Sequence, residues 1–490
     1  MLNHDPDGWF VDYDISEHGY IGDIMGAGSD MVFFSPGDRS KPVINTTKSV
    51  HGNTYYVAVS EQRDIGDKKP YIWIALLTKY PPPVPPTIWS ASNGNLFSGT
   101  YIINFGKAVT IPDESYEIWR TFDGTNYHFL VRISSGPFTD YNIPPLTYVG
   151  YKIRTVDKYQ RYSAYTDTVW SYAPWSRYAS NPVLSPGSVW DSFGHFSPFI
   201  AFDADEYHLF ASGCTGTSTG YQIGHWTLSA SSWDAGTFTG WNPDTGNPVI
   251  APSGAGFMSL GVAESSIFHY ANLWWQLFTG YDNHAGTGMD AAGIGLAWAP
   301  SLNGPWTVVS NTVPLVDLGG VGEWDYHDVF GANMVFKDAQ FKLYYSGGPN
   351  TSDAWRIGLA TSSSILGPFV KSASNPVLLP GASGEWDDVN VNHPRLIDWG
   401  QWLILHYNGN DTALPSLGRF QVGEGYTENY TTLIKSPFNP CLGHTDGNEI
   451  NLRIGHQVFR KPGTNQYYMV YSAADDPTTG IWINLARLWR

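Results

Sequence analysis

The chain has 490 residues, and its 15% aromatic content, 52 glycines, 33 prolines and only 14% charged residues are typical of a turn-rich β protein. A formal net charge of −17 argues against a nucleic acid partner, because nucleic acid is bound by clustered Lys and Arg. Two cysteines are too few for a disulfide framework, and no apolar run is long enough for insertion into a membrane.

Residues 1–80 contain short runs of alternating apolar and polar residues at Trp9–Val11, Met31–Phe34, Thr54–Val59 and Tyr71–Ala75. This alternation predicts a small antiparallel β domain, to which we assign no chemistry. The N-terminus has no basic segment followed by an apolar core, so no secretory signal is expected.

The abundance of Trp, Tyr, Asn, Ser and Thr is nevertheless typical of an extracellular surface. Two interpretations reconcile these observations. The protein is a virion component, such as a phage tail fibre or spike released by lysis, or a signal peptide has been removed from the sequence. We therefore expect an extracellular or virion-associated protein that assembles into a virion or cell surface through residues 1–172.

Residues 81–86 are five prolines and one valine, which form a stiff, extended linker and the clearest domain boundary of the chain. Residues 87–172 follow, with the segments Tyr116–Arg120, Phe138–Tyr141, Thr147–Ile153 and Ser163–Tyr165. In these segments the chain resembles a fibronectin type III domain, which implies a β-sandwich that spaces and orients other domains.

Residues 173–490 contain a repeat that is marked by Pro182, Pro248, Pro314, Pro376 and Pro440, at intervals of 62 to 66 residues. In four of the five copies an Asn precedes the proline. Each copy continues with short runs of β-branched and aromatic residues bounded by turn residues, and no stretch has a helical apolar period. About four strands per unit, repeated five times, predict a five-bladed β-propeller.

The last unit ends after its third strand, so one strand of the fifth blade must come from elsewhere. Residues 173–178 match residues 304–309, the fourth strand of an earlier unit, in sequence and in position. We therefore expect residues 173–178 to complete the last blade and close the ring. Cys214 and Cys441 fall in the first and fifth units, which are neighbours in a closed ring, so a single disulfide and two free thiols both remain open.

The repeats also carry the segments Trp190-Asp191-Ser192, Ser197–Ile200, Tyr344–Gly347 and Ile357–Ser362. In these segments the chain resembles the five-bladed propeller glycosidases, the superfamily of arabinanases, xylosidases, invertases and levansucrases. The resemblance implies a general acid and a second carboxylate at the start of innermost strands, facing one end of the central channel. The corresponding position falls at Ser197, Glu264, Gly331, His393, and Gly455 or His456, so this chain departs from the family pattern at all positions except Glu264.

Residues that recur at the same place in several units are expected to serve the structure of the blade, whereas polar residues that do not recur are candidates for binding or catalysis. Asp191, Asp325 and Asp387 each follow a Trp at the same place in their units, which indicates a structural turn. Asp191 is kept as a catalytic candidate because Trp-Asp-Ser also resembles the nucleophile motif of levansucrases. The polar residues that do not repeat are expected to converge near the channel mouth.

Among them Glu264 is the first candidate for a catalytic carboxylate, with a pKa raised by partial burial, and Asp328 is its expected partner. The expected substrate-binding residues are His195, Asp388, Asn390, His393, Arg395, Glu449, Arg453 and His456. Asp388 and Glu449 are also the next candidates for the partner carboxylate. No spacing of histidines is diagnostic of a metal, and no cofactor is expected.

Two functions follow, both with a polysaccharide or oligosaccharide as partner. The first is a glycoside hydrolase acting in the axial pocket, with Trp274, Trp275, Trp355, Trp399 and Trp402 as candidate stacking surfaces. The alternative is a non-catalytic carbohydrate- or receptor-binding module of a fibre or adhesin, which the substitutions at Ser197, Gly331 and His393 favour. A structural display platform is a third interpretation.

Overall fold

The computed structural model describes two parts of the chain. Before residue 107 it describes the strands named below and residues 85–86. From residue 114 to residue 488 it describes all positions except 141–142, 158–160, 188, 217–219, 287–288, 350–354, 412–419, 444–450 and 475–479. The described residues are almost entirely strands and turns, which confirms the all-β prediction.

The chain divides into two compact units. One comprises Met1–Ser92, Ile102–Thr139 and Gly150–Trp170, and the other comprises Asn93–Tyr101, Asp140–Val149 and Ser171–Arg490. Among the described residues, no helix is long and apolar enough to span a lipid bilayer.

An antiparallel sheet occupies the first 80 residues, as the alternating sequence predicts. Its five strands lie in the order β1-β2-β5-β4-β3. They are β1 (Leu2–Asp5), β2 (Gly8–Asp14), β3 (Val43–Val50), β4 (Asn53–Gln62) and β5 (Ile72–Thr78). The expected strand at Met31–Phe34 lies outside the described residues.

Two further sheets follow, in the orders β10-β7-β6 and β12-β11-β8-β9. Their strands are β6 (Ile88–Asn95), β7 (Thr100–Gly106), β8 (Ser115–Thr121), β9 (Tyr127–Ile133), β10 (Phe138–Asp140), β11 (Tyr148–Val156) and β12 (Val169–Tyr172). Ile103 from the first sheet and Ile118 and Ile153 from the second are completely buried, so the two sheets form a sandwich with an apolar core.

The described residues of the propeller form five blades of four strands each, and a parallel bridge between Ala292 and Val329 joins the second and third blades into one eight-stranded sheet. The first is β14 (Gly194–Asp203), β15 (Glu206–Cys214), β16 (Gln222–Ser229) and β17 (Asn242–Pro243). The second is β18 (Gly261–Tyr270), β19 (Leu273–Asp282), β20 (Asp290–Ala299) and β21 (Thr307–Val308). The third is β22 (Asp328–Lys337), β23 (Gln340–Gly348), β24 (Arg356–Ser362) and β25 (Val370–Lys371). The fourth is β26 (Asn390–Trp399), β27 (Trp402–Asn410), β28 (Gln421–Thr427) and β29 (Ile434–Lys435).

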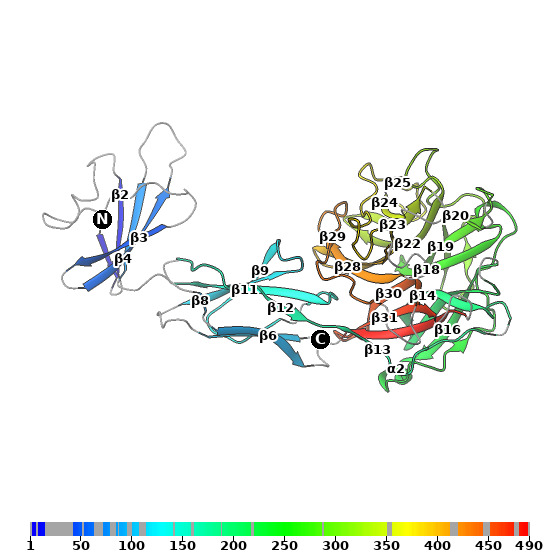
Figure 1. Ribbon diagram of the computed structural model, residues 1–490, viewed down its shortest axis with the longest axis horizontal. Coiled ribbons are helices and arrows are strands. Elements are labelled where there is room, and N and C mark those ends of the chain that lie inside the picture. Colours follow the sequence, from blue (N-terminus) through cyan, green and yellow to red (C-terminus); the bar gives the residue numbers. More distant parts are fainter. Residues whose placement is uncertain are drawn as a thin grey trace. The chain divides into compact units, whose positions relative to one another are not determined.

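The fifth blade confirms the predicted ring closure. It is built from β30 (Asn451–Arg460), β31 (Tyr467–Ala474), β32 (Trp482–Leu488) and β13 (Trp175–Arg177). β13 pairs antiparallel with β32, with Trp175 opposite Leu488, so both ends of the propeller sequence share one sheet. Strands β14, β18, β22 and β30 lie toward the middle of the propeller, and β16, β25 and β13 lie further out (Figure 1).

The recurring Asn-Pro has a structural explanation. The side chain of Asn375 accepts a hydrogen bond from the Leu359 backbone N–H at 2.8 Å and donates one to the Leu359 carbonyl at 3.0 Å. Asn181, Asn247 and Asn439 make the same two bonds to the third strand of the blade that precedes them around the ring. In these four units the segment that leads into the next blade is therefore attached in the same way to the third strand of the blade before it.

The structural interpretation of the Trp-Asp pairs is confirmed for the third and fourth blades. Asp325 accepts a hydrogen bond from the Tyr345 hydroxyl and is ion-paired with Lys371. Asp387 has the same relation to Tyr407 and Lys435. The preceding tryptophans pack over glycines of their own blades. Cys214 and Cys441 are both free thiols.

Candidate functional site

Every innermost strand of the propeller is interrupted by a β-bulge near its start. At each bulge one residue has a left-handed backbone: Ser197 (φ 49°), Glu264 (65°), Gly331 (60°), His393 (50°) and Gly455 (99°). These are the five positions that the repeats align, and the structure identifies Gly455, not His456, as the fifth. A backbone conformation unfavourable for most L-residues is thus repeated around the axis.

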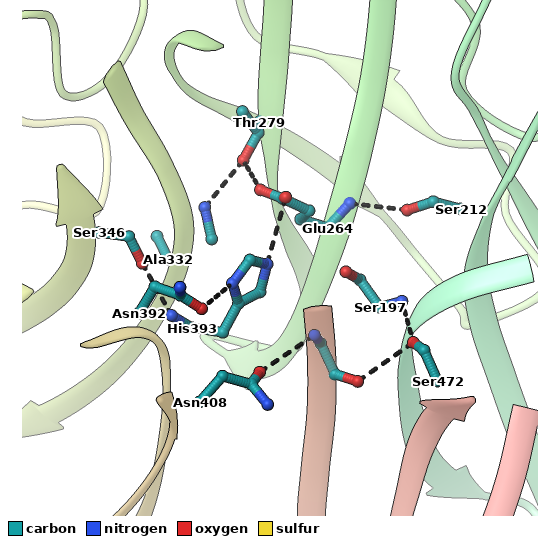
Figure 2. A network of polar contacts seen from close by, with 12 residues as sticks. Ser197, Ser212, Glu264, Thr279, Ala332, Ser346, Asn392, His393, Asn408 and Ser472 are labelled. Carbon is teal, nitrogen blue, oxygen red and sulfur yellow. Dashed lines mark hydrogen bonds and ion pairs between the residues drawn. The ribbon is translucent and has the colours of Figure 1, made fainter. Parts of the chain in front are cut away.

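The backbone N–H of each of these residues donates to a side chain of the preceding blade (Figure 2). The five donor and acceptor pairs are Ser197 and Ser472, Glu264 and Ser212, Gly331 and Thr279, His393 and Ser346, and Gly455 and Asn408, at 2.8–3.0 Å. We call this set the interblade ring. Because it satisfies buried amides at the irregular part of each strand, it fixes the five bulges relative to one another.

Glu264 lies at the centre of the site and is 4% exposed. Its Oε2 accepts from the Thr279 hydroxyl at 2.6 Å and its Oε1 from the Tyr281 hydroxyl at 3.0 Å. His393 Nε2 lies 3.1 Å from Oε1 (Figure 2). Burial alone raises the pKa of Glu264, but His393 and the two hydroxyls outweigh it and lower that pKa below its ordinary value. The expectation of a raised pKa is therefore wrong, because complete burial comes with three partners for the ionised form.

His393 is completely buried, and its other ring nitrogen, Nδ1, lies 3.0 Å from Asn392 Oδ1. Its ring contacts Phe330 edge to face at 5.4 Å between centroids. Burial lowers the pKa of His393, even though the neighbouring Glu264 acts to raise it. The imidazole is therefore a partner of Glu264 within the site, and its Nδ1 is hydrogen-bonded to Asn392.

Asp328, the expected partner carboxylate, begins strand β22 and is 6% exposed. Its Oδ2 accepts from Trp355 Nε1 at 3.1 Å, and its Oδ1 lies 3.2 Å from His327 Nδ1. Burial is the largest influence and raises the pKa of Asp328 in spite of these partners. The charges of Asp328 and Glu264 both act to raise the pKa of the buried Tyr281. The two carboxylates thus share one site, and their pKa values are displaced in opposite directions.

A group of half-buried side chains lies beside these carboxylates: Phe196, Tyr221, Met289 and Trp355. We call it the aromatic patch. It packs on Ala263 and Phe330, the residues directly before the left-handed Glu264 and Gly331, and on Tyr281. Trp355 was expected as a stacking surface, and its contact with Asp328 places it next to a carboxylate.

Arg395 was predicted to bind substrate, and the structure corrects this. The residue is 1% exposed, and its guanidinium donates to the backbone carbonyls of His456, Ala332 and Pro394. His456 is likewise completely buried, with Nδ1 at 3.1 Å from Asn408 Oδ1. Both side chains therefore lie in the interior behind the site and are not placed to contact a substrate.

The remaining candidates occupy other places. His195 Nε2 is hydrogen-bonded to Asp191 at 2.9 Å and its ring packs on Trp226 within the first blade, so this pair belongs to the blade interior. Asp388 accepts from the Gly384 N–H within a turn, and Asn390 accepts from the Trp355 N–H. Glu449 and the side chain of Arg453 lie outside the described residues.

Sequence reasoning missed Thr279 and Tyr281, which bind Glu264, and the other acceptors of the interblade ring. A signal was present, because Ser212, Thr279, Ser346, Asn408 and Ser472 each directly precede a Gly or Ala near the end of the second strand of a unit. Within the described part of the chain, no group of three or more His, Cys, Asp and Glu side chains is placed to hold a metal ion.

Comparison with known proteins gives a result at the level of fold. No protein family and no curated protein matches the sequence. A solved structure described as a complex of BT0996 and RGII has a TM-score of 0.51 and 13% identity, over 64% of this chain and 92% of its own. A structure described as "Glycoside hydrolase" has a TM-score of 0.50 and 12% identity, over 63% of this chain and 92% of its own. The chain therefore shares an all-β propeller fold with these two structures.

Proposed function

We propose that the propeller binds a polysaccharide or oligosaccharide beside the aromatic patch and hydrolyses a glycosidic bond there. One observation carries the proposal: two buried carboxylates in one site have pKa values displaced in opposite directions, upward for Asp328 and downward for Glu264. Pairs of this kind divide the roles of acid and ionised partner at a single pH. The fold shared with a structure described as a glycoside hydrolase supports the same function.

In this mechanism Asp328 is the general acid, since its raised pKa keeps it protonated at a higher pH than an ordinary aspartate. It gives its proton to the leaving oxygen. Glu264 stays ionised and faces the positive charge that develops on the sugar, as base or as nucleophile. These roles reverse the expectation that Glu264 is the acid. Tyr281, Thr279 and His393 hold the Glu264 carboxylate in one orientation.

The experiment pairs a glycan array with a reducing-sugar assay on each bound glycan. We expect Glu264→Gln and Asp328→Asn to keep glycan binding and to lose about 10²- to 10⁴-fold in turnover. The control is Asp317→Asn, an exposed aspartate that caps its own turn, and it should keep both properties. Turnover by the control should fall as pH rises through the raised pKa of Asp328. Unchanged turnover in Asp328→Asn would refute its role as the acid.

A non-catalytic carbohydrate- or receptor-binding module is the second candidate. It is favoured because both oxygens of Glu264 already have partners, and because the other four bulge positions carry no carboxylate. Its signature in the same experiment is a wild-type protein that binds a glycan and releases no reducing sugar from it. A protein that binds no glycan would contradict both hydrolysis and carbohydrate binding.

We also infer that residues 87–172 form a fibronectin type III-like domain. The support is a seven-stranded sandwich of three- and four-stranded sheets, in the orders β10-β7-β6 and β12-β11-β8-β9. Its proposed role is to space the propeller from the N-terminal sheet. The virion and phage tail roles expected from composition gain no support from the comparisons.

A further inference from the structure

The guanidinium of Arg395 is bound by equivalent atoms of three neighbouring blades. Its Nε donates to the His456 carbonyl at 2.8 Å, and its Nη1 lies 3.3 Å from the carbonyls of both Ala332 and Pro394. Each of these carbonyls belongs to the residue directly after a left-handed bulge residue, namely Gly455, Gly331 and His393. Because these residues lie on innermost strands β30, β22 and β26, the side chain occupies the interior of the propeller at its axis.

The charge of this side chain is almost completely enclosed, since Arg395 is 1% exposed. A buried cation is expensive unless polar groups replace water around it. Here carbonyl oxygens replace water around Nε and Nη1, whereas Nη2 has no hydrogen-bond partner among the described residues, and the charge of Glu264 is the favourable ionic influence. Burial lowers the pKa of Arg395 to about 10, so the group remains a cation at neutral pH.

The titratable groups whose charges Arg395 affects are those of the site. Glu264 on β18 acts to keep Arg395 charged, and Arg395 in turn acts to lower the pKa of His393 on β26 and of His456 on β30. His406 on β27 is a further neighbour of His456. The guanidinium therefore favours neutral imidazoles around an ionised Glu264.

We propose that Arg395 is a positioning residue that serves as a built-in cation inside the propeller: its guanidinium binds the bulge carbonyls of three blades together and places a fixed positive charge among the groups of the site. This role does not require that the site hydrolyse a glycan. It requires that a positive charge, and not merely volume, occupy the space among the carbonyls of Ala332, Pro394 and His456.

The test is chemical rescue. Arg395→Ala opens a space lined by these three carbonyls, which a free guanidinium ion fits in shape, charge and hydrogen-bonding capacity. We expect this variant to unfold at a clearly lower temperature than the wild type. Low millimolar guanidinium chloride should restore part of the loss, whereas equal concentrations of urea, a neutral molecule of the same shape, or of sodium chloride should not.

The matched control is Arg460→Ala, because Arg460 is exposed on the adjacent fifth blade and its Nε also donates to a backbone carbonyl, that of Thr464. It should unfold near the wild-type temperature and show no rescue. If Arg395→Ala does not fold on its own, the yield of refolding with guanidinium and with urea gives the same comparison. Equal effects of guanidinium and urea would overturn the proposal.

A second measurement separates charge from packing. NMR of histidines labelled with ¹³C, with His393→Gln to assign the signal, reports the titration of His393. In Arg395→Ala this titration should move to higher pH, and added guanidinium should move it back; in Arg395→Lys, which keeps the charge, it should stay near the wild-type position. An unchanged His393 titration in Arg395→Ala would show that Arg395 has only a packing role. Neither measurement uses turnover, so failure of this proposal and failure of the proposed hydrolysis are distinguishable.

Discussion

Ser346→Ala tests the idea that the interblade ring holds the site together. In the wild type the Ser346 hydroxyl accepts from the His393 N–H at 2.8 Å, and both residues are completely buried. The substitution leaves this amide without a partner where water does not reach. An unsatisfied buried donor costs about 1–3 kcal/mol. In a domain of this size we expect the unfolding temperature to fall by a few degrees, on the order of 2–4 °C per kcal/mol.

The assay is differential scanning calorimetry of the full chain at neutral pH. Ser374→Ala, an exposed serine that precedes the fourth blade, is the control and should change the stability by less than about 0.5 kcal/mol. Thr279→Val should cost more than Ser346→Ala, because Thr279 accepts from the Gly331 N–H and also donates to Glu264. If Ser346→Ala were no less stable than Ser374→Ala, the ring would not be a determinant of the structure and the reasoning would fail.

Two further predictions concern other parts of the propeller. Asn375→Ala should destabilise the third blade by about 2–4 kcal/mol in urea unfolding, because it removes both bonds to the Leu359 backbone, while Asn375→Asp should cost less since it keeps the acceptor. The free energy of unfolding should also fall as the pH drops from 6.5 toward 4. Burial, and after it the charge of the neighbouring His225, lowers the pKa of His208 to about 4 in the folded protein. The unfolded chain therefore binds the proton more readily than the folded chain over this range. This histidine alone accounts for about 3 kcal/mol over that range, and His208→Gln should flatten the dependence of the urea midpoint on pH.

The internal repeat made the fold and the location of the site predictable. Five copies of one unit had to form five similar blades, so the position of Glu264 in its unit also located Ser197, Gly331 and His393. The structure finds these residues at one conformational feature, the left-handed bulge. Because each blade needs a left-handed residue at the same place, the bulge positions recur at the same place in each unit of the sequence. Aligning the units therefore finds these positions even when their partner residues are unknown.

The chemistry of the site was less predictable because it depends on contacts between strands far apart in sequence. The pKa of Glu264 is lowered by Thr279 and Tyr281 on β19 and by His393 on β26, and nothing near Glu264 in the sequence indicates these partners. The same holds for Arg395, whose carbonyl partners at Ala332 and His456 are backbone atoms and leave no residue-type signal. The sequence predicted that Glu264 is buried. Whether the pKa of a buried carboxylate rises or falls, however, depends on which groups are buried next to it.

The departures from the expected glycosidase pattern, at four of the five bulge positions, depend on one another. A Cβ at Gly331 would lie 3.1 Å from the His393 ring, and a Cβ at Gly455 would overlap the Ser197 hydroxyl. The axis therefore has room for the side chains of Ser197, Glu264 and His393, and two glycines are the consequence. A side chain at position 331 would require the His393 ring to move, and that ring is the imidazole that pairs with Glu264. The single carboxylate at the bulges is thus the result of packing around one Glu–His pair, and the second carboxylate of the proposed mechanism, Asp328, comes from the start of a strand instead.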